Sequence, residues 1–301
     1  MTVILYNPHA HSDAGESETK KWVEAHGERV EDMVNILTIE DMGAYVASLS
    51  SADRLFLCGG DGTLTRFADA IRHVNVRVPI YLTAVGTGND FFCDVRYSGI
   101  YDEPLLINQY LHDLPVVYVN GEEHVFVNGV SQGLDGWCAQ MMDDYRKRTN
   151  KLGSYVAFAV KGLLWQFSPR NATVIVDGQE YHYERVWLAA TMNGRFYGGH
   201  QMITPFQDRL NPAKTLTFAI VHDASRFNLL PILPKLSSGK HTKYTKYYTT
   251  FEAHEVTVRF DTPCAMQRDG ETIREVYEYT VRSAPAAARY ERERSAQEEL
   301  V

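Results

Sequence analysis

The segment LFLCGGDGTLTRF, residues 55–67, joins a short apolar run to a helical pattern through three glycines and an aspartate. A run of apolar residues this short is typical of a buried parallel strand. Beyond the glycines, apolar side chains recur with the spacing of one helix face: Leu64, Phe67, Ala68 and Ile71. The segment therefore predicts a strand, a glycine-rich turn and a helix.

The same alternation extends through residues 1–118, with further apolar runs at 2–7 and 78–86 separated by helical patterns. Alternating strands and helices predict an α/β domain with a parallel sheet. From residue 119 onward the pattern changes to β-branched and aromatic runs, with a hairpin signal at Asp177-Gly178.

We therefore predict three parts of the chain. They are an ATP-binding α/β domain at 1–118, a mainly antiparallel β domain at 119–283, and a helix or tail at 284–301. One helical patch, at 154–167, is expected to interrupt the β domain, and the C-terminal segment is expected to pack on the first domain.

Composition excludes several classes of protein. The chain carries 30 Lys plus Arg against 38 Asp plus Glu, and a net charge of −8 argues against a nucleic-acid partner. The four cysteines are scattered, which is typical of reduced thiols in the cytoplasm. No run of 18 apolar residues is present, and the N-terminus resembles a first strand rather than a signal peptide.

The glycine loop suits a phosphate, because glycines let an anion approach backbone N–H groups at a helix N-terminus. Asp61 would repel that phosphate, unless it holds Mg²⁺ or accepts a proton from an attacking hydroxyl. The alternative is a structural glycine turn with a capping aspartate. Taken alone, Gly59–Thr63 leaves both interpretations open.

A second glycine loop favours the functional interpretation. Gly86-Thr87-Gly88-Asn89-Asp90 follows the next apolar run, and Asn7-Pro8 follows the first. The carboxyl ends of parallel strands meet at one edge of the sheet, where ligands bind. Three such loops would form a cradle of nucleotide size.

GGDGTL followed by GTGNDF resembles the diacylglycerol kinase catalytic domain family, which includes bacterial lipid kinases and sphingosine kinases. Other stretches resemble the family's motifs in the same order. They are Asn7-Pro8, GVSQGLDG at 129–136, Asn193-Gly194 with Gly198-Gly199, and Asp269-Gly270-Glu271. The resemblance extends from residue 7 to about residue 271.

The resemblance implies an α/β nucleotide-binding domain like those of phosphofructokinase and NAD kinase, followed by a β-sandwich. It implies transfer of a phosphoryl group from ATP, with Mg²⁺, to a lipid hydroxyl. The implied catalytic residues are Asp61, Asp90 and Glu271, with Glu271 as the base. The implied nucleotide-binding residues are Asn7, Gly59, Gly60, Gly62, Thr63, Gly86, Thr87 and Asn89.

The resemblance implies that Asp61 binds a metal ion. It also implies that Asp135 belongs to the network of residues around a structural magnesium ion. Residues 211–213, Asn-Pro-Ala, stand near the place where bacterial members carry an acidic run that helps to bind this second ion. The acceptor is expected to be diacylglycerol or a related lipid. The alternatives are an NAD kinase-like enzyme and a nucleotide-binding regulator without catalysis.

Two basic stretches with aromatic residues, 145–155 and 235–248, are either solvated loops or contacts with anionic membrane. The expected partner is a lipid substrate at a membrane surface, reached by a cytoplasmic protein that associates peripherally. A homodimer stays an open alternative.

Overall fold

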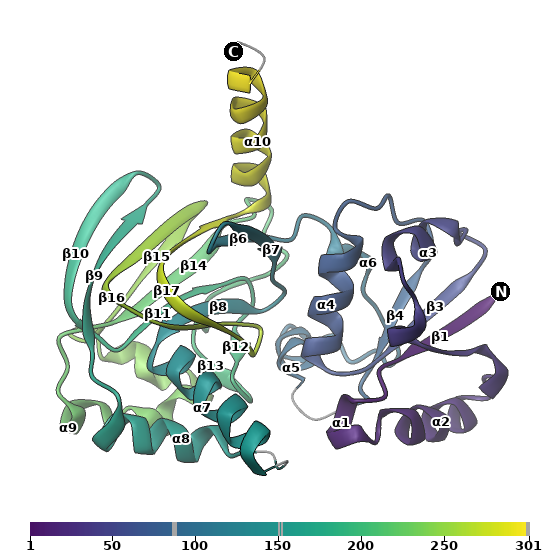
Figure 1. The fold of residues 1–301 in the computed structure, drawn as a ribbon, viewed down its shortest axis with the longest axis horizontal. Coiled ribbons are helices and arrows are strands. Elements are labelled where there is room, and N and C mark those ends of the chain that lie inside the picture. The colour runs from purple at the N-terminus through teal and green to yellow at the C-terminus, as the bar shows by residue number, and fades with distance from the viewer. Residues whose placement is uncertain (86–88, 150, 152, 299–301) are drawn as a thin grey trace. The chain divides into compact units, whose positions relative to one another are not determined.

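The protein is described by a computed structural model that covers residues 1–85, 89–149, 151 and 153–298 (Figure 1). It divides into two compact units, Met1–His112 and Asp113–Val301, each with its own hydrophobic core.

The first unit is an α/β domain built on five strands in the order β2-β1-β3-β4-β5. Its elements are β1 (Thr2–Tyr6), α1 (Ala10–Asp13), α2 (Gly15–His26), η1 (Val30–Asp32), β2 (Met33–Asn35), η2 (Ile36–Thr38), α3 (Met42–Ser48), β3 (Arg54–Cys58), α4 (Asp61–Ile71), β4 (Ile80–Thr83), α5 (Asp90–Tyr97), β5 (Leu105–Leu106) and α6 (Asn108–Leu111). The pairs β1–β2, β1–β3 and β3–β4 are parallel. The short β5 pairs antiparallel with β4, which makes the sheet mixed at that edge.

The strand, turn and helix predicted around the first glycine loop are present as β3 and α4. The four apolar positions predicted to share a helix face are all buried: Leu64, Phe67, Ala68 and Ile71. The helix packs through this stripe because burying apolar surface, rather than helix propensity, supplies most of a short helix's stability.

The second unit contains a large antiparallel sheet in the order β15-β14-β11-β8-β16-β17-β6-β7, with β9 pairing both β10 and β16. Its elements are β6 (Val116–Val119), β7 (Glu122–Val125), β8 (Gly129–Gly133), α7 (Leu134–Thr149), α8 (Tyr155–Lys161), η3 (Gly162–Gln166), β9 (Arg170–Val176), β10 (Gln179–Val186), β11 (Leu188–Met192), β12 (Phe196–Tyr197), β13 (Gln201–Met202), β14 (Leu216–Val221), α9 (Arg226–Leu229), η4 (Leu233–Ser238), η5 (Lys240–Lys243), β15 (Tyr248–Ala253), β16 (Glu255–Arg268), β17 (Glu271–Arg282) and α10 (Ala284–Glu298).

The long strand β16 connects two parts of this sheet. Its first half, Val256–Phe260, pairs with β9, and its second half, Met266–Arg268, pairs with β8. An irregularity in its pairing with β17 lies between Arg259 and Cys264. Bends of this kind let one strand serve two layers, with the side chains of both layers forming the core between them. The predicted α/β domain followed by a β-sandwich is confirmed.

The predicted hairpin at Asp177-Gly178 is also confirmed. It joins β9 to β10, and both residues have positive φ, at 46° and 85°. A two-residue turn of this kind requires positive φ at both positions, which aspartate and glycine tolerate.

The expectation of a single helical patch in the second unit was wrong, because α7 precedes it. The helix packs directly on β16: a Cβ on Gly136 would lie 2.0 Å from the carbonyl oxygen of Ala265. Its buried face contains small residues, among them Cys138 and Ala139, instead of a long apolar stripe. The sequence of α7 therefore lacks the apolar pattern that predicts a helix. Residues 145–149 of the basic stretch 145–155 belong to this helix.

The C-terminal segment forms α10, which is held to its own unit by Arg282. The guanidinium of Arg282 lies over the ring of Tyr290, at 3.8 Å from its centroid, and over Tyr118, at 4.7 Å. Packing of this segment on the first domain stays a prediction.

Asp269 anchors the turn between β16 and β17. Its carboxylate accepts hydrogen bonds from the backbone N–H groups of Val127, Asn128 and Gly129, at 2.6, 2.8 and 2.9 Å. Asp269 and Gly270 have φ of 46° and 89°, so the turn again needs positive φ at both positions. The carboxylate thus ties the tip of the hairpin to the start of β8.

We predict that Asp269→Ala lowers the free energy of unfolding by about 3 kcal/mol or more, because it leaves three buried N–H groups without an acceptor. Urea unfolding of the full chain measures this. The matched control is Asp261→Ala, which changes an exposed aspartate of the same strand. Equal midpoints for the two variants would show that Asp269 is not an anchor.

Candidate nucleotide loops and an apolar cavity

Three loops of the first unit follow β1, β3 and β4, whose carboxyl ends lie at the same edge of the sheet. The first two loops are joined by a side-chain hydrogen bond, in which Asn7 Nδ2 donates to Thr63 Oγ1 at 3.1 Å. Asn7 Oδ1 accepts from the backbone N–H of His9 at 3.0 Å, which orients the amide. Asn7 therefore holds the loop after β1 against the first turn of α4.

Asp61 joins the second loop to the third. Its carboxylate accepts the backbone N–H of Asp90 at 2.7 Å and that of Phe91 at 3.0 Å. These are the first two residues of α5, so Asp61 caps the next helix rather than its own. The structural and functional interpretations of this aspartate therefore overlap: it fixes the start of α5, and it stands at the N-terminus of α4.

The glycines of the first loop have different roles. A Cβ on Gly59 would lie 2.6 Å from Thr63 Cβ and Oγ1, so this glycine allows the loop to close on the helix. Gly60 precedes α4 in an extended conformation and accepts the N–H of Thr63 at 3.0 Å. A Cβ on Gly62 would meet nothing within 4 Å. Gly62 therefore leaves open space beside the first turn of α4.

Most of the residues that the sequence predicts for nucleotide binding lie in the loops that these hydrogen bonds join. Asn89 directly precedes α5, and its carbonyl oxygen accepts the N–H of Cys93 at 2.9 Å. Asp90 is buried, with 6% of its surface exposed. Gly86 and Thr87, which were also predicted, lie outside the described residues. The N-terminus of α4, an 11-residue helix, presents backbone N–H groups and a positive partial charge, which favour an anion.

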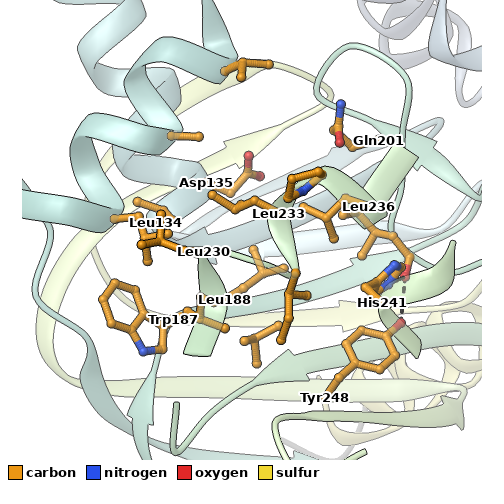
Figure 2. Close-up of a pocket in the computed structure, with 18 of the residues that line it drawn as sticks. Leu134, Asp135, Trp187, Leu188, Gln201, Leu230, Leu233, Leu236, His241 and Tyr248 are labelled. Carbon is orange, nitrogen blue, oxygen red and sulfur yellow. Dashed lines mark hydrogen bonds between the residues drawn. The ribbon is translucent and has the colours of Figure 1, made fainter. Parts of the chain in front are cut away.

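The second unit contains a cavity of about 380 Å³ (Figure 2). Such a volume falls within the range of ligand pockets. Its lining is mostly aliphatic and aromatic and comes from α8, η3, β11 and the segment from α9 to η5; it includes Leu163, Trp187, Leu188, Leu230, Leu233 and Leu236. The cavity therefore suits an apolar ligand.

Asp135 places one carboxylate in the wall of this cavity (Figure 2). It is buried, with 3% exposed, and the hydroxyl groups of Ser131 and Tyr155 donate to its two carboxylate oxygens. Burial raises the pKa of Asp135, and the two hydroxyl hydrogen bonds act in the opposite direction. A hydrogen-bonding group on an otherwise apolar ligand would find its partner here.

His241 is a second polar group of the lining, and it is held in place by the backbone. Its Nε2 lies 2.9 Å from the carbonyl oxygen of Ile203, which also accepts the hydroxyl of Tyr248 at 2.6 Å. A carbonyl can only accept, so Nε2 carries the proton. Burial lowers the pKa of His241, which favours the neutral imidazole.

Glu271, the predicted base, is the first residue of β17 and lies directly after the turn anchored by Asp269. Its carboxylate accepts from Arg268 at 2.9 Å, and the Arg268 side chain is only 8% exposed against 29% for Glu271. The ion pair fixes the direction of the carboxylate while leaving it accessible. Glu271 and Asp135 belong to the second unit, whereas Asp61 and Asp90 belong to the first.

The residues near Asp135 do not fit a structural magnesium ion. In the described part of the chain, no cluster of three or more His, Cys, Asp or Glu side chains could hold a metal. Asn211 closes the turn where an acidic run was expected: its amide donates to the carbonyl oxygens of Asp208 and Thr215, at 2.7 and 3.0 Å. Asp135 as a metal ligand therefore gains no support from this geometry.

Asp61 is different, because magnesium bound to a nucleotide needs only one or two protein carboxylates and takes its other ligands from phosphates and water. Asp61 accepts two backbone hydrogen bonds, and a carboxylate can accept more than two partners. Its position at the start of α4 therefore fits such an ion.

Comparison with known proteins gives the family. Residues 1–115 match the model of the diacylglycerol kinase catalytic domain, and residues 128–289 match that of the YegS C-terminal NAD kinase beta sandwich-like domain. Together the two matches cover more than half of the chain. The chain therefore belongs to the diacylglycerol kinase catalytic domain family, and membership of a kinase family implies ATP as the phosphoryl donor.

Similar proteins include two from staphylococci that carry the name "putative lipid kinase". The one from Staphylococcus haemolyticus is 26% identical over 74% of this chain and 71% of its own length. The one from Staphylococcus aureus strain JH9 is 25% identical over 73% and 70%. A crystal structure titled as a "putative diacylglycerol kinase" from Bacillus anthracis shares the fold, with a TM-score of 0.63, 18% identity and coverage of 94% and 92%.

The sequence did not reveal the cavity. Its lining residues come from segments between residues 134 and 248, and no local pattern connects them. The run LLPILPKL at 229–236 was the available signal, since its leucines and isoleucine are too dense for a solvated loop.

No helix in the described part of the chain combines the length and apolarity needed to cross a membrane.

We predict opposite effects for alanine at two glycines of the first loop. Gly59→Ala should lower the melting temperature, because its Cβ would displace Thr63 and weaken the Asn7–Thr63 hydrogen bond. Gly62→Ala should preserve or raise it, because alanine favours a helix by up to about 1 kcal/mol and open space receives the methyl group. Thermal unfolding of both variants tests this, and a destabilised Gly62→Ala protein would contradict it.

Proposed function

We propose that this protein is an ATP-dependent lipid kinase that phosphorylates the hydroxyl of diacylglycerol or a related lipid. The observation that carries the proposal is the mostly apolar cavity with Asp135 in its wall, in a chain whose other unit contains the connected glycine loops. An NAD kinase would instead need a pocket for a charged dinucleotide. The aliphatic lining of this cavity favours a lipid chain.

ATP is proposed to bind at the loop edge of the first unit. Gly60, Gly62 and Thr63 would bring the N-terminus of α4 to the phosphates, and Asn7 and Asn89 would border them from the neighbouring loops. Gly59 would act through loop closure, and Gly86 and Thr87 are retained from the sequence prediction. Asp61, with Asp90, would hold a magnesium ion, which neutralises phosphate charge when it is bound.

The lipid hydroxyl is proposed to transfer its proton to Glu271. Arg268 holds the Glu271 carboxylate at 2.9 Å, so the base would be oriented before substrate binds. The acyl part of the lipid would lie in the cavity, with a polar group near Asp135. Diacylglycerol is the first candidate acceptor because similar proteins carry the name diacylglycerol kinase. Peripheral association with a membrane follows from such a substrate.

The first test of this proposal is Asp61→Asn, which we expect to abolish lipid phosphorylation while the protein stays folded. Asparagine keeps one oxygen that can accept a hydrogen bond from α5, whereas the negative charge is lost. Radiolabelled ATP with a total lipid extract measures the activity. The control is Asp69→Asn on the same helix, which should retain activity. Full activity of Asp61→Asn would disprove the role of this residue.

The second test fills the cavity. Ala159 lines it and is 8% exposed, so Ala159→Phe should raise KM for a water-soluble short-chain diacylglycerol by roughly tenfold or more, with KM for ATP unchanged. Ala157→Phe changes an exposed position of the same helix and is the matched control. Unchanged lipid kinetics in Ala159→Phe would show that the acyl chain binds elsewhere.

A further inference from the structure

Large apolar side chains are exposed around the cavity. Val156 and Val160 lie one turn apart on α8, are 60% and 37% exposed, and also line the cavity, so they form part of its rim. Trp165 on η3 is 73% exposed and Phe227 on α9 is 81% exposed. These four residues define what we call the rim surface. An exposed tryptophan and phenylalanine on elements that also line the cavity indicate a binding surface.

The elements that carry these residues form one continuous structure. The guanidinium of Arg226 on α9 donates to the carbonyl oxygens of Leu163 and Phe167, both at 2.9 Å. It also lies over the ring of Trp187, at 5.8 Å from the centroid. Arg226 therefore fixes α9 against the end of η3, which keeps Phe227 and Trp165 on adjoining elements.

The charge around the rim surface is positive, although the whole chain carries −8. The two segments that build it, 145–170 and 224–251, contain eleven Lys and Arg and not one of the chain's 38 Asp and Glu. Six of these cations are exposed lysines: Lys147, Lys151, Lys161, Lys240, Lys243 and Lys246. This distribution matches an anionic surface, and both segments also contribute residues to the cavity lining.

We propose that the rim surface docks the mouth of the cavity onto an anionic lipid bilayer. Trp165 and Phe227 would enter the interfacial region, where aromatic side chains are favoured, and the lysines would contact the headgroups. This inference rests on the proposed function, since it explains how a lipid acceptor reaches the cavity. A bilayer is favoured over a protein partner because apolar anchors and acid-free basic segments coincide on these elements.

Tryptophan fluorescence tests the insertion directly. Of the four tryptophans, Trp22 and Trp187 are buried and Trp137 is half-buried, so Trp165 is the exposed reporter. Vesicles of phosphatidylglycerol and phosphatidylcholine should shift the emission to the blue, and brominated acyl chains should quench it. Trp165→Phe should remove both signals while vesicles still pellet the protein. An unchanged spectrum of the original protein with bound vesicles would overturn the insertion of Trp165.

Vesicle pelleting without ATP tests the surface as a whole. The double variant Trp165→Ser with Phe227→Ser should bind phosphatidylglycerol vesicles at least tenfold more weakly than the original chain. Replacing Lys240, Lys243 and Lys246 by Gln should weaken binding on the order of a hundredfold and reduce its salt dependence. The control is Leu37→Ser with Tyr101→Ser, which removes two exposed apolar side chains of the first unit.

The outcomes separate this inference from the kinase assignment. Binding that is equal for the rim variant and the control overturns the rim surface, as does a failure of the original protein to bind vesicles. A concentration-dependent dimer that the rim variant abolishes, without vesicle binding, would assign the surface to self-association instead. If no lipid of a total extract is phosphorylated, the kinase assignment fails, whereas the pelleting result still decides the docking surface.

Discussion

The hydrogen bonds from Asp90 and Phe91 to the carboxylate of Asp61 are the interaction on which the first unit's loop edge depends. Asp61 and Thr63 lie two residues apart in the first turn of α4. Asp61 holds the start of α5, and Thr63 holds the loop after β1. Three segments that are distant in sequence are thus fixed by one helical turn. The strands set the direction in which these segments leave the sheet, and the first turn of α4 sets the distance between them. An anion with several oxygens would require such a fixed distance.

Buried carboxylates organise the second unit in a similar way. Asp269 is satisfied by three backbone N–H groups and Asp135 by two hydroxyl groups, so neither is an isolated charge in the interior. The first fixes a hairpin and thereby the start of β17. The second stands in a cavity wall, where its polarity is available to a ligand. The same residue type therefore anchors a turn in one place and lines a cavity in the other.

Local patterns predicted most of the fold. The α/β alternation and the Asp177-Gly178 hairpin could be predicted because residues that are adjacent in sequence determine them. Helix α7 was missed, since Gly136 suggests a loop until its close contact with Ala265 is known. The sequence predicted the loops of the candidate site. It did not predict the hydrogen bonds of Asn7 and Asp61 that join them. The cavity could not be predicted, because only the folded chain brings residues 134 and 248 to the same cavity.

The contact of Gly136 with β16 has a consequence for how this protein can change over time. Because α7 meets the strand through backbone atoms, the place of Asp135 is set by main-chain geometry and not by the volume of an intervening side chain. Substitutions in the sandwich core can then accumulate without moving that carboxylate. The rest of the lining, which is mostly aliphatic and aromatic, can then be remodelled for apolar ligands of different shape while Asp135 stays in place.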